Sequence, residues 1–180
     1  MSVLIIAEHH QGQLADSAAR LVTAATRLGA EVHLLLLLGQ GLAEAGAQAA
    51  SLQGVTRVLL AEHPMLAEGL NDGIDRLLAP VVRDYQHCLM AASSHGKDLL
   101  PRVAARLGVE MISEVTEIEG PDTFLRPLYA GNAIARVAST APVKVLSIRA
   151  SAFPCAESGG AGARVDHLPA PELACRTRPL

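Results

Sequence analysis

Apolar and polar residues alternate along positions 1–110 in a pattern that predicts strands and helices in turn. Four segments are short and largely apolar, as buried strands are: 2–9, 31–39, 57–63 and 87–93. Four longer segments place apolar residues at helical spacing: 14–30, 42–54, 64–85 and 96–108. This alternation predicts a mainly parallel sheet with helices on both faces, which is a three-layer α/β fold.

Local signals set the expected helix ends. Asp16 or Ser17 is expected to cap the first helix, and Gly29 is expected to end it. Pro64 suits the first turn of the third helix, whereas Pro80 predicts a kink or break inside it.

The pattern changes after residue 110. Four segments read as consecutive strands with no helix between them, which predicts antiparallel additions to the sheet: 111–119, 123–131, 132–139 and 143–149. From Ala150 onward the chain carries four prolines and three glycines without periodicity. We therefore expect one α/β domain over 1–150 and a linker or docking tail over 151–180.

Composition narrows the class of protein. Half of the 180 residues are hydrophobic and the net charge is −3, with no basic stripe, so neither nucleic acid nor an anionic membrane is an expected partner. The three cysteines and seven histidines lack disulfide or metal-site spacing, so we expect no metal. The first residues lack a signal-peptide pattern, and no apolar run approaches the ~20 residues that span a bilayer. We expect a cytoplasmic bacterial protein that is not membrane-embedded.

One candidate ligand site is "SSHGKD" (93–98), which follows a strand and opens a helix. Ligands gather at the carboxyl ends of parallel strands, so Ser94, Gly96 and Lys97 are weak candidates for holding an anion of a cofactor. The spacing is not that of a P-loop, and capping of the helix by Ser93 or Ser94 is the favoured interpretation.

Two further stretches carry weaker signals. "GQGLAEAG" (39–46) resembles a dinucleotide-binding turn, but Glu44 stands where the third glycine belongs, and a plain strand-to-helix turn is favoured. The acidic run "EVTEIE" (114–119) holds carboxylates for acid–base chemistry, but a solvated edge strand is favoured. No residue is predicted to be catalytic.

The stretch "FLRPLYAGNAIARV" (124–137) predicts a hairpin rather than a catalytic loop. Gly131 and Asn132 tolerate positive φ between two strand-like runs, and Pro127 predicts an edge or bulged strand. An arginine at an edge can pair with a partner's carboxylate, so Arg126 is a weak candidate for partner binding. Tyr129 and Asn132, in the same stretch, are two further weak candidates.

Taken together, the segments resemble the N-terminal domain of the electron transfer flavoprotein alpha subunit over roughly residues 1–155. The matching stretches run in family order: "VLIIAEH" (3–9), 24–39, "GVTRVLLAE" (54–62), "GKDLLPRVAARLGV" (96–109), "ISEV" (112–115), "DTFLRPLYAGNAIARV" (122–137) and "VKVLSIRASAF" (143–153). The segments around Gly96–Arg102 and Arg126–Ala133 are the most specific.

The resemblance implies a fold like that of adenine nucleotide hydrolases and a scaffold role in a heterodimer with a beta subunit. The family is an electron carrier rather than an enzyme. It holds FAD mainly on the C-terminal domain of the alpha subunit and often AMP in the beta subunit. Family members carry electrons from flavin dehydrogenases, including those of fatty-acid oxidation, to the respiratory chain.

The printed sequence stops before the segment in which the family's flavin-binding domain begins. We therefore expect FAD to bind the assembled family protein and not this chain alone. Two alternatives remain open from the residues: a freestanding adenine-nucleotide-binding module that uses 39–46 and 93–97, and an inactive remnant.

Overall fold

A seven-stranded parallel sheet forms the centre of the molecule. The computed structural model describes residues 2–10, 12–39, 43–64, 66 and 73–169. The strand order is β12-β5-β4-β1-β6-β11-β7. The strands are β1 (Ser2–Ala7), β4 (Glu31–Leu38), β5 (Val55–Glu62), β6 (His87–Ala91), β7 (Met111–Val115), β11 (Lys144–Ile148) and β12 (Arg164–His167).

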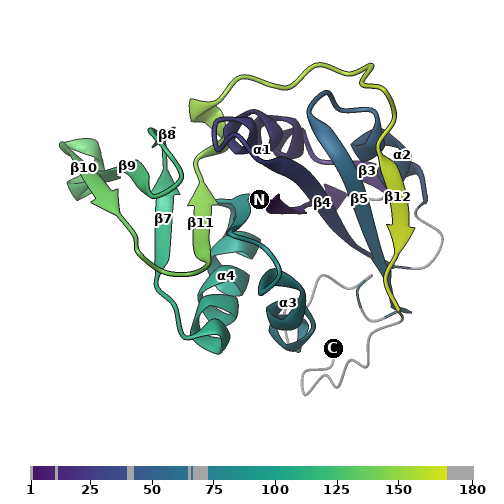
Figure 1. The fold of residues 1–180 in the computed structure, drawn as a ribbon, viewed down its shortest axis with the longest axis horizontal. Helices are drawn as coiled ribbons and strands as arrows, with labels where there is room; N and C mark the ends of the chain where they lie inside the picture. The colour runs from purple at the N-terminus through teal and green to yellow at the C-terminus, as the bar shows by residue number, and fades with distance from the viewer. Residues whose placement is uncertain (1, 11, 40–42, 65, 67–72, 170–180) are drawn as a thin grey trace.

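Two pairs of helices cover the two faces of this sheet, as Figure 1 shows. On one face lie α1 (Asp16–Thr26) and α2 (Ala43–Ala50), and on the other lie α3 (Ile74–Val82) and α4 (Ser94–Leu107). Successive residues of β1 enter opposite cores, with Ile5 packing on the α1 side and Leu4 on the α3 side. The predicted three-layer α/β class is confirmed. The antiparallel pairing predicted for 111–119 and 143–149 is wrong for β7 and β11, which pair in parallel within the main sheet. None of the helices in the described ranges has the length and apolar character needed to cross a membrane.

Two small antiparallel sheets complete the fold. A two-stranded sheet pairs β2 (His9–His10) with β3 (Gln13–Leu14). A three-stranded sheet, β8 (Glu117–Ile118), β9 (Thr123–Leu128) and β10 (Ala133–Ala138), projects beside β7 in Figure 1. The single strand predicted over 111–119 is therefore wrong, because the chain leaves the main sheet after Val115 and starts β8 in another sheet.

The helix ends differ from the local predictions. Asp16 and Ser17 lie inside the first turn of α1, and the N-cap is Ala15 without a side-chain hydrogen bond. The helix ends at Thr26, three residues before Gly29. Pro80 lies inside α3, which continues to Val82, so the predicted break is absent. The part of the predicted third helix that precedes α3 falls largely outside the described residues.

Residues 150–168 cross the α1–α2 face from the end of β11 to the far edge of the sheet, which is β12. They begin at a short 3₁₀ turn, Ala150–Ala152, and the Phe153 side chain is buried against α1. Arg20 of α1 donates to the Phe153 carbonyl oxygen at 2.7 Å, and the Ala163 amide donates to Ala50 at the end of α2. The segment then adds β12 beside β5. No strand was predicted there, because the pairing supplies a strand that local sequence does not encode.

Two histidines, the buried His87 and the half-buried His33, make the stability of the fold depend on pH. His87 at the start of β6 donates from Nε2 to the Pro121 carbonyl oxygen at 2.6 Å, which ties the main sheet to the β8–β9 turn. His33 Nδ1 lies 2.9 Å from the Tyr85 hydroxyl oxygen. Burial lowers the pKa of both imidazoles below the usual value. The folded protein therefore favours the neutral rings.

Because both pKa values are lowered in the folded state, the unfolded chain binds more protons below about pH 6.5. We expect the contribution of the two histidines to the free energy of unfolding to be largest above that pH. It should be lost as the pH drops through their pKa values in the folded state. Urea unfolding at about pH 7.5 and about pH 5.5 measures this loss. His87→Gln keeps a donor for Pro121 without a titrating ring, so it should reduce the loss. An equal loss in the variant contradicts the role of His87.

Candidate functional site

The order of the strands reverses beside β1, and this reversal creates a crevice at the carboxyl ends of the strands. From β1 the chain builds outward through β4 to β5 and then returns to place β6 on the other side of β1. The helices that follow β1 and β6 lie on opposite faces, so the two connections diverge. Parallel α/β sheets bind ligands at such points. In this protein a pocket of about 250 Å³, the switch-point pocket, opens at the carboxyl ends of the strands beside β1. Its polar lining consists of Glu8, Ser17, Ser93, Glu114 and Arg149.

The N-terminus of α4 faces this switch-point pocket. The Ser93 hydroxyl oxygen accepts a hydrogen bond from the Gly96 amide at 3.0 Å, so the predicted capping by Ser93 is confirmed. The same hydroxyl donates to the Glu8 carboxylate, and His95 Nδ1 lies 3.9 Å from Glu8 Oε1. Ser94 is exposed on the first turn. The positive end of α4 thus already faces a carboxylate of this chain.

Gly96 is required by packing rather than by a ligand. Its Cα lies against the end of β6, and a Cβ at this position would overlap the Ala91 carbonyl oxygen. The backbone of α4 approaches the strand closely only because residue 96 has no side chain. Gly96, one of the three cofactor candidates, is therefore buried against the sheet, and packing explains the glycine at this position.

Lys97, the third candidate, forms an ion pair instead of presenting a free charge. Its Nζ lies 2.7 Å from Glu114 Oε1, and Arg149 Nε lies 3.1 Å from Glu114 Oε2. The hydrogen bond from Lys97, followed by that from Arg149, lowers the pKa of the Glu114 carboxyl below its usual value. Lys97, from α4, and Arg149, after β11, are thereby joined through one carboxylate from β7.

Glu114 adopts a backbone conformation that side chains other than glycine rarely take. Its φ is 59°, and its amide donates to the Ser147 hydroxyl at 2.9 Å. The register between β7 and β11 shifts at the same place. Left-handed backbone at such a residue costs on the order of 1 kcal/mol, which the two ion pairs and the hydrogen bond offset. The edge position predicted for the acidic run is confirmed, because β7 and β8 are each edge strands and Glu117 and Glu119 are exposed. Glu114 is half-buried and ion-paired instead of solvated, and it is the centre of this cluster.

Carboxylates occupy the positions at which a phosphate would bind in the switch-point pocket. Glu8 lies at the N-terminus of α4, and Glu114 pairs with both Lys97 and Arg149. The two carboxylates balance the two cations, so a nucleotide phosphate entering the pocket would meet no excess of positive charge. At about 250 Å³ the pocket is also smaller than the usual range for drug-sized ligands, and FAD is larger still. The residues of this pocket do not fit FAD or AMP.

The other predicted nucleotide loop is only partly described. Residues 40–42 of the 39–46 stretch lie outside the described residues. Gly46 lies within α2, where a Cβ would come within 3.2 Å of the Leu60 side chain. This glycine therefore serves the packing of α2 on β5.

The predicted hairpin is present, with a longer turn than expected. β9 and β10 pair antiparallel, and residues 129–132 connect them. Tyr129, Ala130 and Gly131 have positive φ, whereas Asn132 is right-handed at −71°. Pro127 lies in the middle strand of the small sheet rather than at its edge, but β8 pairs with β9 only at 124 and 125.

The three partner-binding candidates differ in exposure. Tyr129 is 81% exposed at the tip of the hairpin, and Asn132 is exposed beside it. Arg126 is half-buried and donates to the Ser113 hydroxyl at 2.8 Å, so it braces β9 against β7. The structure therefore pairs Lys97 with Glu114, which lines the switch-point pocket, and keeps the hairpin residues at a separate surface. Sequence reasoning missed Glu8 and Arg149, which carry no local motif.

Comparison with known proteins identifies the family. Residues 3–173 match the family model described as the electron transfer flavoprotein domain. The chain is 42% identical over 171 residues to the electron transfer flavoprotein subunit alpha of Pseudomonas aeruginosa, covering 95% of this chain and 55% of that protein. It is 38% identical over 161 residues to the corresponding subunit of Paracoccus denitrificans, covering 89% and 52%. The chain spans about half the length of the curated relatives it matches.

Substitution of Gly96 tests the close approach of α4 to β6. Gly96→Ala should lower the free energy of unfolding by about 2 kcal/mol or more, because either the helix or the strand must move. Gly120→Ala is the matched control, since a Cβ there meets no atom within 4 Å and its φ is not positive. Denaturant unfolding measures both variants, and equal stabilities would contradict the packing role.

Proposed function

Since the chain belongs to the electron transfer flavoprotein family, we propose that it acts as the N-terminal part of an alpha subunit and as a scaffold for a beta subunit. The assembled protein would hold FAD and carry electrons between flavin dehydrogenases, such as those of fatty-acid oxidation, and the respiratory chain. It would be a carrier rather than an enzyme. AMP, where present, would belong to the beta subunit.

The observation that carries this proposal is the exposed apolar surface of the β9–β10 hairpin. We call Tyr129, Asn132 and Ile134 the hairpin surface. Tyr129 is 81% exposed in the turn between β9 and β10, and Ile134 is 59% exposed in β10, whose sheet projects from the main body (Figure 1). Exposed aromatic and aliphatic side chains grouped on a projecting element are typical of a protein interface. β10 also forms one edge of its sheet.

Two features support a scaffold role over a cofactor-binding role. The switch-point pocket is neutralised by the chain's own ion pairs, and its carboxylates disfavour phosphate groups. The same features count against the alternative of a freestanding adenine-nucleotide-binding module. The flavin is accordingly expected to need parts of the assembled protein beyond this chain.

Binding to a purified beta subunit tests the hairpin surface. Tyr129→Ala should weaken the affinity by about tenfold or more, because an exposed aromatic side chain that anchors an interface contributes on that scale. The Tyr129→Ala variant should fold normally, since the Tyr129 side chain is largely exposed. Arg102→Ala on the exposed face of α4 is the control. Isothermal titration with unchanged affinity for Tyr129→Ala would place the interface elsewhere. Arg126→Ala should also weaken association, but its contact with Ser113 makes it a less direct test.

Titration of the chain alone with FAD tests the placement of the cofactor. We expect no saturable quenching of flavin fluorescence, because the switch-point pocket is small and carries two carboxylates. Stoichiometric binding of FAD would show that this domain holds flavin by itself and would overturn the scaffold proposal.

A further inference from the structure

A row of polar side chains lies on the α3 face of the sheet, at the end opposite the switch-point pocket. His33 of β4 and Arg57 of β5 are register neighbours, and Arg164 of β12 is the next residue in the row. The row beyond them is apolar toward α3, with Leu35 and Leu59 in the core. The polar row therefore begins where the helix layer stops covering the sheet.

A pocket of about 310 Å³ opens over this row. Its floor is the sheet at His33, Arg57 and Leu59, and its wall is the end of α3 with Asp84 and Tyr85. The volume lies at the lower end of the range for small-molecule sites, which combine apolar walls with a few convergent polar groups. We call it the β4–β5 pocket.

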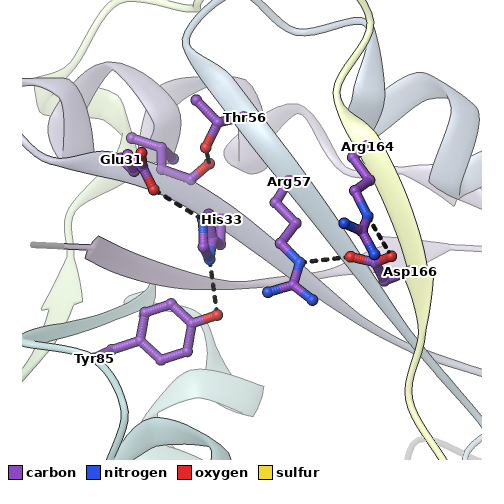
Figure 2. Close-up of polar contacts among 8 residues, drawn as sticks. Glu31, His33, Thr56, Arg57, Tyr85, Arg164 and Asp166 are labelled. Atoms are coloured by element: carbon purple, nitrogen blue, oxygen red, sulfur yellow. Dashed lines mark hydrogen bonds and ion pairs between the residues drawn. The ribbon is translucent and has the colours of Figure 1, made fainter.

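Arg57 is positioned through its Nε atom, and the two terminal nitrogens of its guanidinium group are not part of that contact. Its Nε lies 2.6 Å from Asp166 Oδ2, and Arg164 Nε lies 2.7 Å from the other oxygen of the same carboxylate (Figure 2). Figure 2 shows that neither terminal nitrogen of Arg57 is joined to Asp166 and that one of them points toward the side where Tyr85 lies. No acceptor within the described part of the chain bonds these two nitrogens. A positioned guanidinium with free N–H groups binds a carboxylate well.

The His33–Tyr85 pair holds the Tyr85 hydroxyl in the pocket wall. His33 Nδ1 lies 2.9 Å from the Tyr85 hydroxyl oxygen, so the two side chains share a hydrogen bond. A Glu31 carboxylate oxygen lies 3.7 Å from His33 Nε2, beyond hydrogen-bond distance. With either tautomer of His33 the Tyr85 oxygen keeps a lone pair for a donor from another molecule.

Asp84 adds a second acceptor to the same wall of the pocket. Its side chain is exposed and lines the pocket beside Tyr85. The pocket thus offers donors at Arg57 and acceptors at Tyr85 and Asp84. A phosphate dianion would be repelled by Asp84, whereas a molecule with separate acid and donor groups would satisfy both ends.

From this arrangement we propose that the β4–β5 pocket binds a small carboxylic acid that also carries an ammonium or hydroxyl group. The carboxylate bonds the terminal nitrogens of Arg57. The ammonium or hydroxyl group donates to the Tyr85 oxygen and the Asp84 carboxylate. This site does not depend on the proposed pairing with a beta subunit, because the hairpin surface belongs to the separate three-stranded sheet.

Titration of the whole chain, followed by ¹H–¹⁵N NMR at the Arg57 Nε–H signal, tests the site. L-Serine and L-lactate are the probes, acetate supplies the acid group alone, and ethanolamine supplies the donors alone. We expect saturable shifts with serine and lactate, affinity at least about tenfold lower for acetate, and no saturation with ethanolamine. Absence of saturation with both probes, or equal affinity for acetate, overturns the proposal.

Two variants separate the ends of the site. Asp84→Asn should lower the affinity for serine toward that for acetate and leave acetate unchanged; because Asp84 is exposed, this variant should fold normally. Arg57→Lys removes the Arg57 reporter signal, so its binding is followed at the backbone amide of Tyr85, which also lines the pocket. This variant should bind serine and acetate alike about tenfold or more weakly, since the fork of N–H groups is lost. Arg102→Lys on α4 is the control and should change neither. If Asp84→Asn binds serine with unchanged affinity, Asp84 does not accept a hydrogen bond from the ammonium or hydroxyl group of the ligand.

Discussion

The burial of β1 on both faces and both edges is the constraint on which the rest of the structure depends. Val3, Leu4, Ile5 and Ile6 are almost completely excluded from solvent. Their backbone groups need partners inside the protein, and β4 and β6 supply these on either side. Their side chains need apolar cover above and below, which α1 and α4 help to supply. The placement of β6 beside β1 also creates the switch point, so the pocket there is a consequence of how the central strand is paired.

At that switch point the chain uses its own charges where a nucleotide-binding relative of the fold would leave room for phosphate. Glu114 joins α4, β7 and the end of β11 through Lys97 and Arg149, and this arrangement requires a left-handed residue within a strand. The ion pairs are partly exposed, so each contributes modestly to stability. Their larger effect is on chemistry, since Glu114, together with Glu8, balances the two cations that a phosphate group would otherwise bind. The break at Glu114 also ends β7 and sends the chain into the small sheet that bears the hairpin.

The two pockets and the hairpin surface of this domain are spatially separate and differ in character. The switch-point pocket is internally neutralised, the hairpin surface is apolar and exposed, and the β4–β5 pocket keeps unsatisfied donors and acceptors. The segment 150–168 connects two of these regions, because it starts beside Arg149 and ends at β12, where Asp166 orients Arg57. In this member of the electron transfer flavoprotein family, one compact fold thus presents three surfaces of different chemical character.

The amino-acid sequence by itself determined the α/β class, the alternation of strands and helices, the Ser93 cap and the hairpin, because each of these depends on contacts between near neighbours or on apolar periodicity. It also carried the family resemblance. Only the tertiary structure decided the roles of Glu8, Glu114, Arg149 and Asp166. Each of them acts on a residue more than fifteen positions away in the sequence, and no local spacing encodes such a contact. The same reason explains β12, whose strand conformation comes from pairing with β5 and not from its own residues.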